Sequence, residues 1–277
     1  GNDGAGGAVE RRAKGGKGRA FTGVAAAAVT TVLAIVVAGQ VADGGNGGIP
    51  VVGDGQRDDS QDASRSDQRP EPAESPAAVP LSYADKLAQE NPLDPELAGS
   101  GEFETVGGSG KGSGKGQVLR YRVDVEKGLP LDAEFFAQAV QKTLNDKRSW
   151  SHDGAYSFER VSEGRSDFAI TLASPGTTAT WCAKSGLDTT VDNVSCDSAA
   201  TDRVMINAYR WARGSKTFEN KISEYREMLI NHEVGHRLGL NHERCGAEGA
   251  RAPVMMQQTK SLTSRGLTCR TNAWPFP

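Results

Sequence analysis

The alternation of apolar and polar residues is clearest in the second half of the chain. Residues 117–126, QVLRYRVDVE, alternate strictly. A period of two is typical of a half-buried strand, because successive side chains of a strand point to opposite faces. Residues 131–146 instead repeat large apolar side chains at intervals of four after Asp132. This spacing predicts an amphipathic helix with Asp132 as its N-cap.

Three more strands and a second helix follow. The strands are expected at residues 156–162, 167–174 and 203–209. The helix is expected to begin near Phe218, because apolar side chains then recur on one helical face as far as residue 229. The order strand, helix, three strands, helix predicts an α/β or α+β sheet with helices packed on it, and we adopt the α+β class.

The first 42 residues show no such alternation of apolar and polar positions. Residues 1–19 are basic, and residues 20–42 form an uncharged run of 23 residues, AFTGVAAAAVTTVLAIVVAGQVA. A helix of this length reaches roughly 34 Å, enough to cross a bilayer. The basic flank predicts a cytoplasmic tail before a transmembrane anchor, with the rest of the chain outside. Two alternatives stay open: a signal segment cleaved near Ala38 or Ala42, or a buried soluble helix.

Residues 43–98 are rich in Gly, Asp, Ser and Pro and offer little to bury, which predicts a disordered linker. The stretch from residue 81 to 101 offers a short helix, but its prolines argue against a domain. We therefore expect one folded domain at residues 99–277. The net charge of −3 gives no indication of nucleic-acid binding.

The four cysteines all lie beyond the predicted membrane segment, at positions 182, 196, 245 and 269. Four cysteines allow three pairings. We favour Cys182 with Cys196, which would pin a loop, and Cys245 with Cys269, which would tie the histidine region to the C-terminal tail. An extracytoplasmic location permits both bonds. The alternative is that Cys245 is a metal ligand.

Three other features are expected to be structural. The run GGSGKGSGKG at residues 107–116 lacks the Ser or Thr that follows the Lys of a phosphate-binding loop, so we expect a flexible turn between two strands. His152 is expected to be a solvated loop residue. Trp274 and Phe276 are expected to close a core rather than to bind a ligand.

Three of the four histidines lie in one short stretch, NHEVGHRLGLNHERC at residues 231–245. His232 and His236 are four residues apart on the predicted helix, so they project from one face. Gly239 can adopt a positive φ, end the helix and turn the chain back. His242 would then reach the same point from another direction.

Three imidazoles suit Zn²⁺ and leave a coordination position for water. Glu233, beside the first of these histidines, would take a proton from that water, because zinc lowers the pKa of water towards about 7. We therefore expect zinc ligands at His232, His236 and His242 and a general base at Glu233. The alternatives are a non-catalytic zinc site, or surface histidines at a helix end.

The pattern H-E-x-x-H-x-x-G-x-x-H resembles the metzincin zinc metallopeptidases. That resemblance implies a mixed sheet packed against the active-site helix, and a turn whose Met lies beneath the metal. The segment APVMMQQ offers Met255 for this role, with Met256 as the alternative, although both could simply fill the core. The resemblance also implies that residues 203–209 form an edge strand that pairs with an extended substrate.

Two further resemblances refine this one. Glu243 directly after His242 is similar to the astacins, but their Tyr two residues beyond the Met is Gln257 here, so no tyrosine helper is expected. With the segments RYRVDVEKGL, RSW, PVMMQQTK and WPFP, residues 100–277 resemble an uncharacterised family of actinobacterial envelope proteins. That family implies no substrate.

These expectations describe a membrane-anchored, extracytoplasmic zinc peptidase acting on a peptide or protein substrate outside the cell, or a secreted one if the first segment is cleaved. One alternative is a zinc hydrolase of a non-peptide amide in the cell envelope. The other is an anchored, non-catalytic zinc-containing binding module, which would have no use for Glu233 as a base.

Overall fold

The computed structural model describes residues 80–277. Its helices are α1 (Tyr83–Ala88), α2 (Ala133–Leu144), α3 (Pro175–Ala183), α4 (Ala208–Arg213) and α5 (Ile222–Arg237), with two short 3-10 helices, η1 (His152–Gly154) and η2 (Lys216–Phe218). Its strands are β1 (Phe103–Thr105), β2 (Gln117–Glu126), β3 (Tyr156–Arg160), β4 (Phe168–Ala173), β5 (Cys196–Ser198), β6 (Arg203–Asn207), β7 (Thr263–Ser264) and β8 (Leu267–Thr268).

No helix within residues 80–277 is both long and apolar enough to cross a bilayer. The predicted basic tail at 1–19, the membrane segment at 20–42 and the first part of the predicted linker lie outside the described residues.

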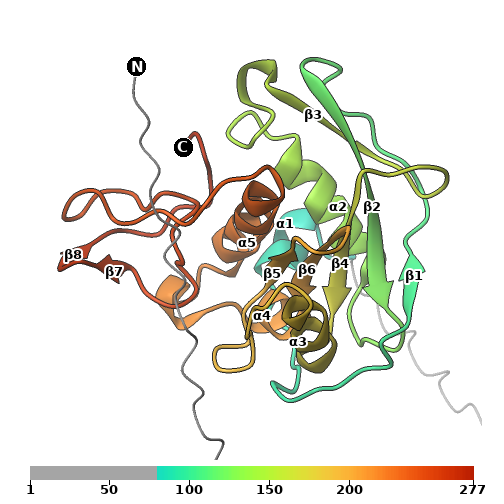
Figure 1. The fold of residues 1–277 in the computed structure, drawn as a ribbon, viewed down its shortest axis with the longest axis horizontal. Helices are drawn as coiled ribbons and strands as arrows, with labels where there is room; N and C mark the ends of the chain where they lie inside the picture. The colour runs from blue at the N-terminus through green and yellow to red at the C-terminus, as the bar shows by residue number, and fades with distance from the viewer. Residues whose placement is uncertain (1–79) are drawn as a thin grey trace, which may run out of the picture. The chain divides into compact units, whose positions relative to one another are not determined.

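One mixed sheet organises the domain (Figure 1). Its six strands follow the order β1-β2-β4-β6-β5, with β3 also paired to β2. Strands β2, β4 and β6 run parallel, whereas β5 is antiparallel to β6 and forms the edge of the sheet. Helices and a mixed sheet in one unit confirm the α+β class.

The main core lies between the sheet and helices α2 and α5. The predicted face of β2 is confirmed, because Tyr121, Val123 and Val125 are buried in this core. Helix α2 packs its apolar stripe on them, and the side chain of Asp132 accepts a hydrogen bond from the backbone N–H of Phe135 as the expected N-cap. Trp274 is buried in the same core, as predicted.

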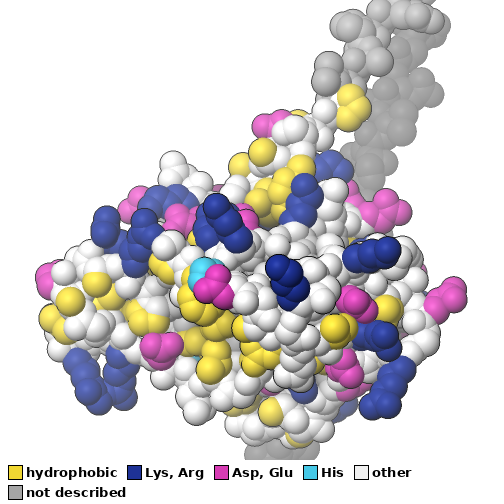
Figure 2. Space-filling model, turned by 90° about the horizontal axis from the view of Figure 1, so that it is seen from above, with side chains coloured by type: hydrophobic (Ala, Val, Ile, Leu, Met, Phe, Trp, Pro, Cys, Tyr) yellow, Lys and Arg dark blue, Asp and Glu magenta, His cyan; other side chains and the backbone are white. Residues whose placement is uncertain are grey.

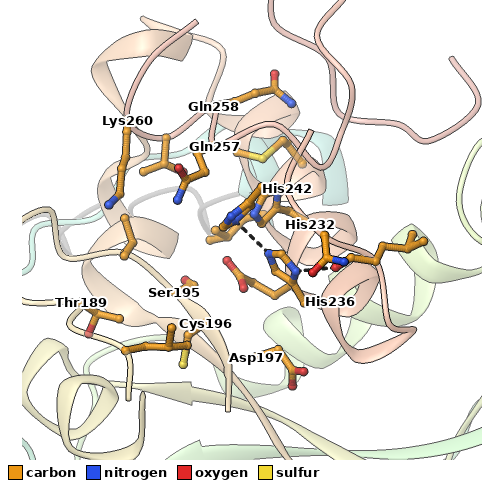
Figure 3. A pocket seen from close by; sticks show the side chains of 18 of the residues that line it. Thr189, Ser195, Cys196, Asp197, His232, His236, His242, Gln257, Gln258 and Lys260 are labelled. Atoms are coloured by element: carbon orange, nitrogen blue, oxygen red, sulfur yellow. Dashed lines mark hydrogen bonds between the residues drawn. The ribbon is translucent and has the colours of Figure 1, made fainter. Parts of the chain in front are cut away.

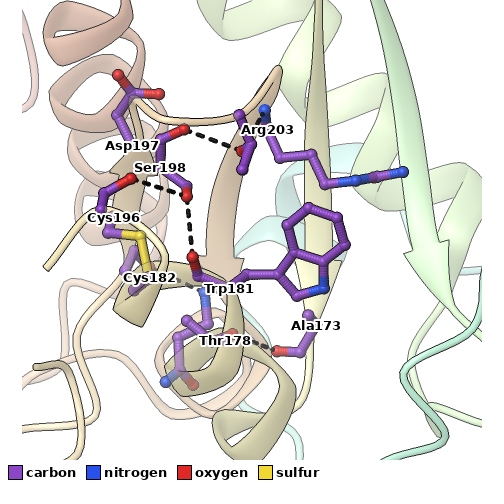
Figure 4. Close-up of a disulfide and its surroundings, with 12 residues drawn as sticks. Ala173, Thr178, Trp181, Cys182, Cys196, Asp197, Ser198 and Arg203 are labelled. Atoms are coloured by element: carbon purple, nitrogen blue, oxygen red, sulfur yellow. Dashed lines mark hydrogen bonds between the residues drawn. A yellow bond between two sulfur atoms is a disulfide. The ribbon is translucent and has the colours of Figure 1, made fainter. Parts of the chain in front are cut away.

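The opposite face of the sheet is covered by α3. The predicted disulfide between Cys182 and Cys196 is present and joins α3 to the edge strand β5 (Figure 4). Beside it, the Ser198 hydroxyl donates to the Trp181 carbonyl at 2.9 Å. The short strand β5 is therefore attached to α3 by a disulfide and a hydrogen bond.

The prediction that residues 203–209 form an edge strand was wrong. Residues 203–207 form β6, which lies between β4 and β5, and residues 208–209 already belong to α4. Strand β5 was not predicted because three residues are too few to show an alternating pattern. The edge of the sheet on this side is therefore β5 and not residues 203–209.

The predicted turn at residues 107–116 is also more ordered than expected. Gly110 exchanges two backbone hydrogen bonds with Arg160 of β3. Gly116 has φ +73°, and a Cβ there would lie 2.0 Å from the carbonyl oxygen of Gly154. Only glycine fits this approach of the chain to the loop before β3.

Figure 2 shows one face of the domain, where basic and acidic side chains are interspersed and hydrophobic side chains lie between them. A nucleic-acid-binding surface would gather Lys and Arg into one patch. This face has no such patch.

The predicted linker ends earlier than residue 98. Residues 80–98 are ordered against the domain, and α1 buries Leu87 in the main core. The reason is a long-range contact with Arg226 of α5, which is fully buried. Its guanidinium donates to the carbonyls of Lys86 and Leu87, and also to those of Gln89 and Trp211, at 2.8–3.0 Å.

Replacing Arg226 with Met should therefore destabilise the domain by about 3 kcal/mol, because the carbonyls at the end of α1 would lose their buried donor. Thermal unfolding measures this. Arg213→Met is the control: Arg213 pairs at 3.1 Å with Glu90, but both side chains are nearly half exposed, so the loss should stay below about 1 kcal/mol. Equal losses for the two variants would contradict the role given to Arg226.

Candidate metal centre

The three predicted histidines come together at one point. His232 and His236 project from the last turns of α5, and His242 follows after the helix ends. One nitrogen atom from each ring lies within 4.8 Å of the other two. The Nε2 atoms of His236 and His242 are 3.1 Å apart. In the described part of the chain, no other group of three potential metal ligands is this close.

Hydrogen bonds on the far side of the rings orient two of these histidines, and Figure 3 draws the one at His236. The Nδ1 of His232 lies 2.8 Å from the Val254 carbonyl oxygen, and the Nδ1 of His236 lies 2.8 Å from that of Leu240. A carbonyl only accepts, so each Nδ1 carries the proton and each Nε2 keeps its lone pair. Metal-binding histidines commonly have such a carbonyl partner. The residues therefore fit a metal ion.

The end of α5 brings His242 to this point. Gly239 has φ +90°, as predicted from its position. Its N–H bonds to the His236 carbonyl at 2.8 Å, and the Leu240 N–H bonds to the Gly235 carbonyl at 3.0 Å. These two bonds form a Schellman motif, which satisfies the last carbonyls of the helix and reverses the chain.

Met255 lies behind the histidines. A Cβ on Gly235, between the first two ligands, would be 2.3 Å from the Met255 Sδ and 2.9 Å from Cζ2 of Trp150. Met256 instead packs with the Cys245–Cys269 pair. The Glu243 N–H donates to the Met255 carbonyl at 3.0 Å, which holds the chain after His242 against this turn. The geometry favours Met255 over Met256 as the residue beneath the ligands.

Glu233 is buried beside the three histidines and lines the same cavity as Asp197 of strand β5. Burial raises the pKa of Glu233 to about 8, and the nearby Asp197 carboxylate adds to this increase. Burial lowers the pKa of His232 to about 3, so this ring is neutral near pH 7. A buried carboxylate that readily takes a proton is suited to act as a base.

The Asp197 carboxylate has a partner of its own. It forms a contact of 2.5 Å with Arg237, the last residue of α5. Arg237 also donates to the carbonyls of Thr201 and Arg203 at 3.0 and 3.1 Å. One guanidinium thus ties the end of the metal-site helix to the β5–β6 connection, and it fixes the distance between the histidines and the edge strand.

A cavity of about 510 Å³ opens beside the three histidines. One wall is α5, the second is residues 187–199, which include β5, and the third is residues 257–260 after the Met pair. Gln257 lines the cavity at the position where the astacins carry Tyr, and no tyrosine is among the described lining residues. His152 does not line it either; its ring stacks on Phe276 with centroids 4.3 Å apart.

Both predicted disulfides are present, so Cys245 is bonded to Cys269 and is not a metal ligand. Phe276 remains 46% exposed and, unlike Trp274, does not close a core.

The whole of residues 92–277 matches the model of one protein family, DUF3152, which is described as a protein of unknown function. The chain belongs to the DUF3152 family. Neither a curated protein nor a solved structure matches the chain. The histidine cluster, the Met pair and both disulfides all lie within the family match.

Sequence reasoning missed the residues that support the histidine cluster from other elements. Trp150 donates from its indole to the Asn231 carbonyl at 2.9 Å, one residue before the first ligand. Asp197, Arg237 and Lys260 line or hold the cavity walls. The only signal for Trp150 was the segment RSW, for Lys260 the segment PVMMQQTK, and for Arg237 its place next to His236. Asp197 carries no local pattern.

Gly235→Ala should disturb this site from behind. The Met255 side chain is flexible, but the Trp150 ring is held by its hydrogen bond to Asn231, so we expect a loss of about 1–3 kcal/mol and weaker metal binding. Thermal unfolding and Zn²⁺ competition with a chelator measure both. The control is Gly246→Ala, where a Cβ meets nothing within 4 Å. The packing argument fails if Gly235→Ala behaves like this control.

Proposed function

We propose that this chain is a zinc-dependent peptidase of metzincin type. The observation that carries the proposal is the convergence of three imidazole nitrogens beside a buried glutamate, within a cavity walled by the edge of a sheet. The 3.1 Å between two of the nitrogens is close to the spacing of about 3.3 Å expected for tetrahedral zinc with nitrogen ligands at about 2.0–2.1 Å.

When bound, zinc would lower the pKa of a water molecule and polarise the carbonyl group of the substrate. The chain's own residues supply the rest. Glu233 takes the proton from the attacking water and passes it to the leaving amine. Its burial supports the first of these steps, because a pKa raised to about 8 makes the carboxylate a better proton acceptor. The positive charge of zinc would offset part of this increase.

Strand β5 supports the choice of a peptide substrate. It is the edge strand of the sheet, and Cys196 and Asp197 line the cavity. An extended peptide can add to such an edge through backbone hydrogen bonds. Because Arg237 holds β5 against the end of α5, a peptide in this position would lie across the histidines.

The proposal places this peptidase outside the cytoplasm, attached through residues 20–42 or released after cleavage there. Its support within the described residues is the pair of disulfides, which persist in oxidising compartments. The substrate would then be a peptide or protein outside the cell.

Glu233→Gln separates a catalyst from a scaffold that only holds zinc. The variant keeps the size of the side chain and all three ligands, so it should fold and bind one zinc ion per chain. Removing the base should slow hydrolysis by roughly 10²- to 10⁴-fold. The measurement is turnover of a peptide library by wild type and variant at equal zinc content.

His236→Ala is the matched comparison, because it should lose zinc together with activity. Equal rates for wild type and Glu233→Gln would exclude Glu233 as the base. No cleavage of any peptide by the zinc-loaded wild type would instead favour a non-catalytic zinc-binding module or an enzyme acting on a non-peptide amide.

A further inference from the structure

The cavity extends beyond the histidines into the interior of the domain. Met228 and Leu229 of α5 line it and are only 1% and 2% exposed. Ser195 and Thr189, from the facing wall, are also buried. A cavity lined by such buried residues can enclose a whole side chain of a substrate, whereas a shallow surface groove could not. Apolar atoms of α5 would contact the stem of that side chain.

One side of the cavity is polar. The Thr189 side chain is 4% exposed, and its hydroxyl has no hydrogen-bond partner among the described residues. Figure 3 draws Lys260 and Thr189 on the same side of the histidines, and Asp197 below them. A hydroxyl and an ammonium group can both donate hydrogen bonds. This side of the cavity, from the buried Thr189 to Lys260 at the rim, therefore offers donors to a group that accepts hydrogen bonds.

Lys260 is the only Lys or Arg among the described lining residues, and the carboxylates that line the cavity are already engaged. The Asp188 carboxylate accepts from the N–H and hydroxyl of Thr190 at 2.9 and 2.7 Å. Asp197 contacts Arg237, and Glu233 is the proposed base. Lys260 is therefore the one cationic side chain among the described lining residues with which a ligand could pair, beside an Asp188 carboxylate that keeps its negative charge.

Lys260 does have a partner at the rim. Its Nζ is 3.3 Å from the Asp192 carboxylate, with the two side chains 39% and 44% exposed. An exposed pair of this kind contributes roughly 0–1 kcal/mol, and the lysine stem is flexible. A ligand carboxylate inside the less exposed cavity can therefore compete with Asp192 for the ammonium.

We propose that Lys260 and Thr189 make this cavity a binding site for a substrate carboxylate next to the scissile bond. The carboxylate would belong either to an acidic side chain of glutamate length or to the free C-terminus of a peptide. This inference rests on the proposed zinc peptidase and names the class of substrate for it.

Binding of hydroxamates to the full-length, zinc-loaded protein tests the proposal without turnover. Three probes share the metal-binding group and differ in the first side chain after it, which is that of Glu, Gln or Lys. Calorimetry should give a Kd for the Glu probe that is roughly tenfold lower than for the Gln probe, since a charged pair binds more strongly than a neutral one. The Lys probe should bind most weakly.

Two variants assign the preference to Lys260. Lys260→Met should make the Glu and Gln probes equal, and Lys260→Glu should reverse the order in favour of the Lys probe. Asp192→Asn should tighten the Glu probe, because it removes the competing carboxylate. Zinc content is measured for each protein, so that a lost metal is not mistaken for a lost contact.

Two further probes consist of the hydroxamate and a single residue. The fourth probe ends in a free carboxylic acid, and the fifth ends in an amide. A Lys260-dependent gain for the free acid alone would identify a chain terminus as the ligand, and a gain for the Glu side chain alone would identify an acidic residue. Equal affinities of all probes, or an unchanged preference in Lys260→Met, would overturn the proposal.

Failure of the proposed function gives a different result. If no hydroxamate binds the zinc-loaded protein, both the peptidase and the carboxylate site are rejected. If the probes bind with the Lys260-dependent preference while no peptide is cleaved, the carboxylate site stands and the catalytic role falls. If peptides are cleaved with no preference for carboxylates, the peptidase stands and the carboxylate site falls.

Discussion

The histidine site depends on how helix α5 ends. A continuing helix could present only two of the imidazoles on one face, so the third must come from a chain that turns back. Gly239 makes that turn, with φ +90°. Leu240 then has two functions: its N–H closes the Schellman motif on Gly235, and its carbonyl lies 2.8 Å from the Nδ1 of His236. The turn that ends the helix therefore also orients the ring of His236.

The remaining structure holds this helix end in place from three sides. Trp150 and Met255 pack behind Gly235, so the ligand-bearing turn cannot shift backwards. Arg237 fixes the edge strand β5 at a set position in front of it. The Cys245–Cys269 disulfide closes the segment just after His242. Holding ligands by packing and hydrogen bonds outside the site is what gives a metal site its geometry.

The sequence predicted the features whose cause is local. The long strand β2, the helices α2 and α5, and the histidine spacing each show a clear period or a capping residue, and the structure has all of them. It did not predict α1 as part of the domain, because the prolines nearby indicate a linker and the buried contact with Arg226 joins residues about 140 apart. Strand β5 is too short for a pattern, and its place at the edge results from pairing with β6.

The sequence also could not distinguish between adjacent residues of the same type. Met255 and Met256 are chemically identical, and only the packing of one against Gly235 and of the other against the disulfide distinguishes them. Lys260 and Thr189 belong to two loops that meet only in the folded chain. The meeting of the three histidines could therefore be predicted from the sequence, whereas the cavity beside them could not.

X-ray absorption at the zinc edge, on the full-length protein purified in the presence of Zn²⁺, tests the central claim most directly. The account predicts one zinc ion per chain, with three imidazole nitrogens at about 2.0–2.1 Å and one further oxygen ligand, and the signal should be lost in His242→Ala. A sulfur ligand at about 2.3 Å, or the absence of bound zinc, would contradict it.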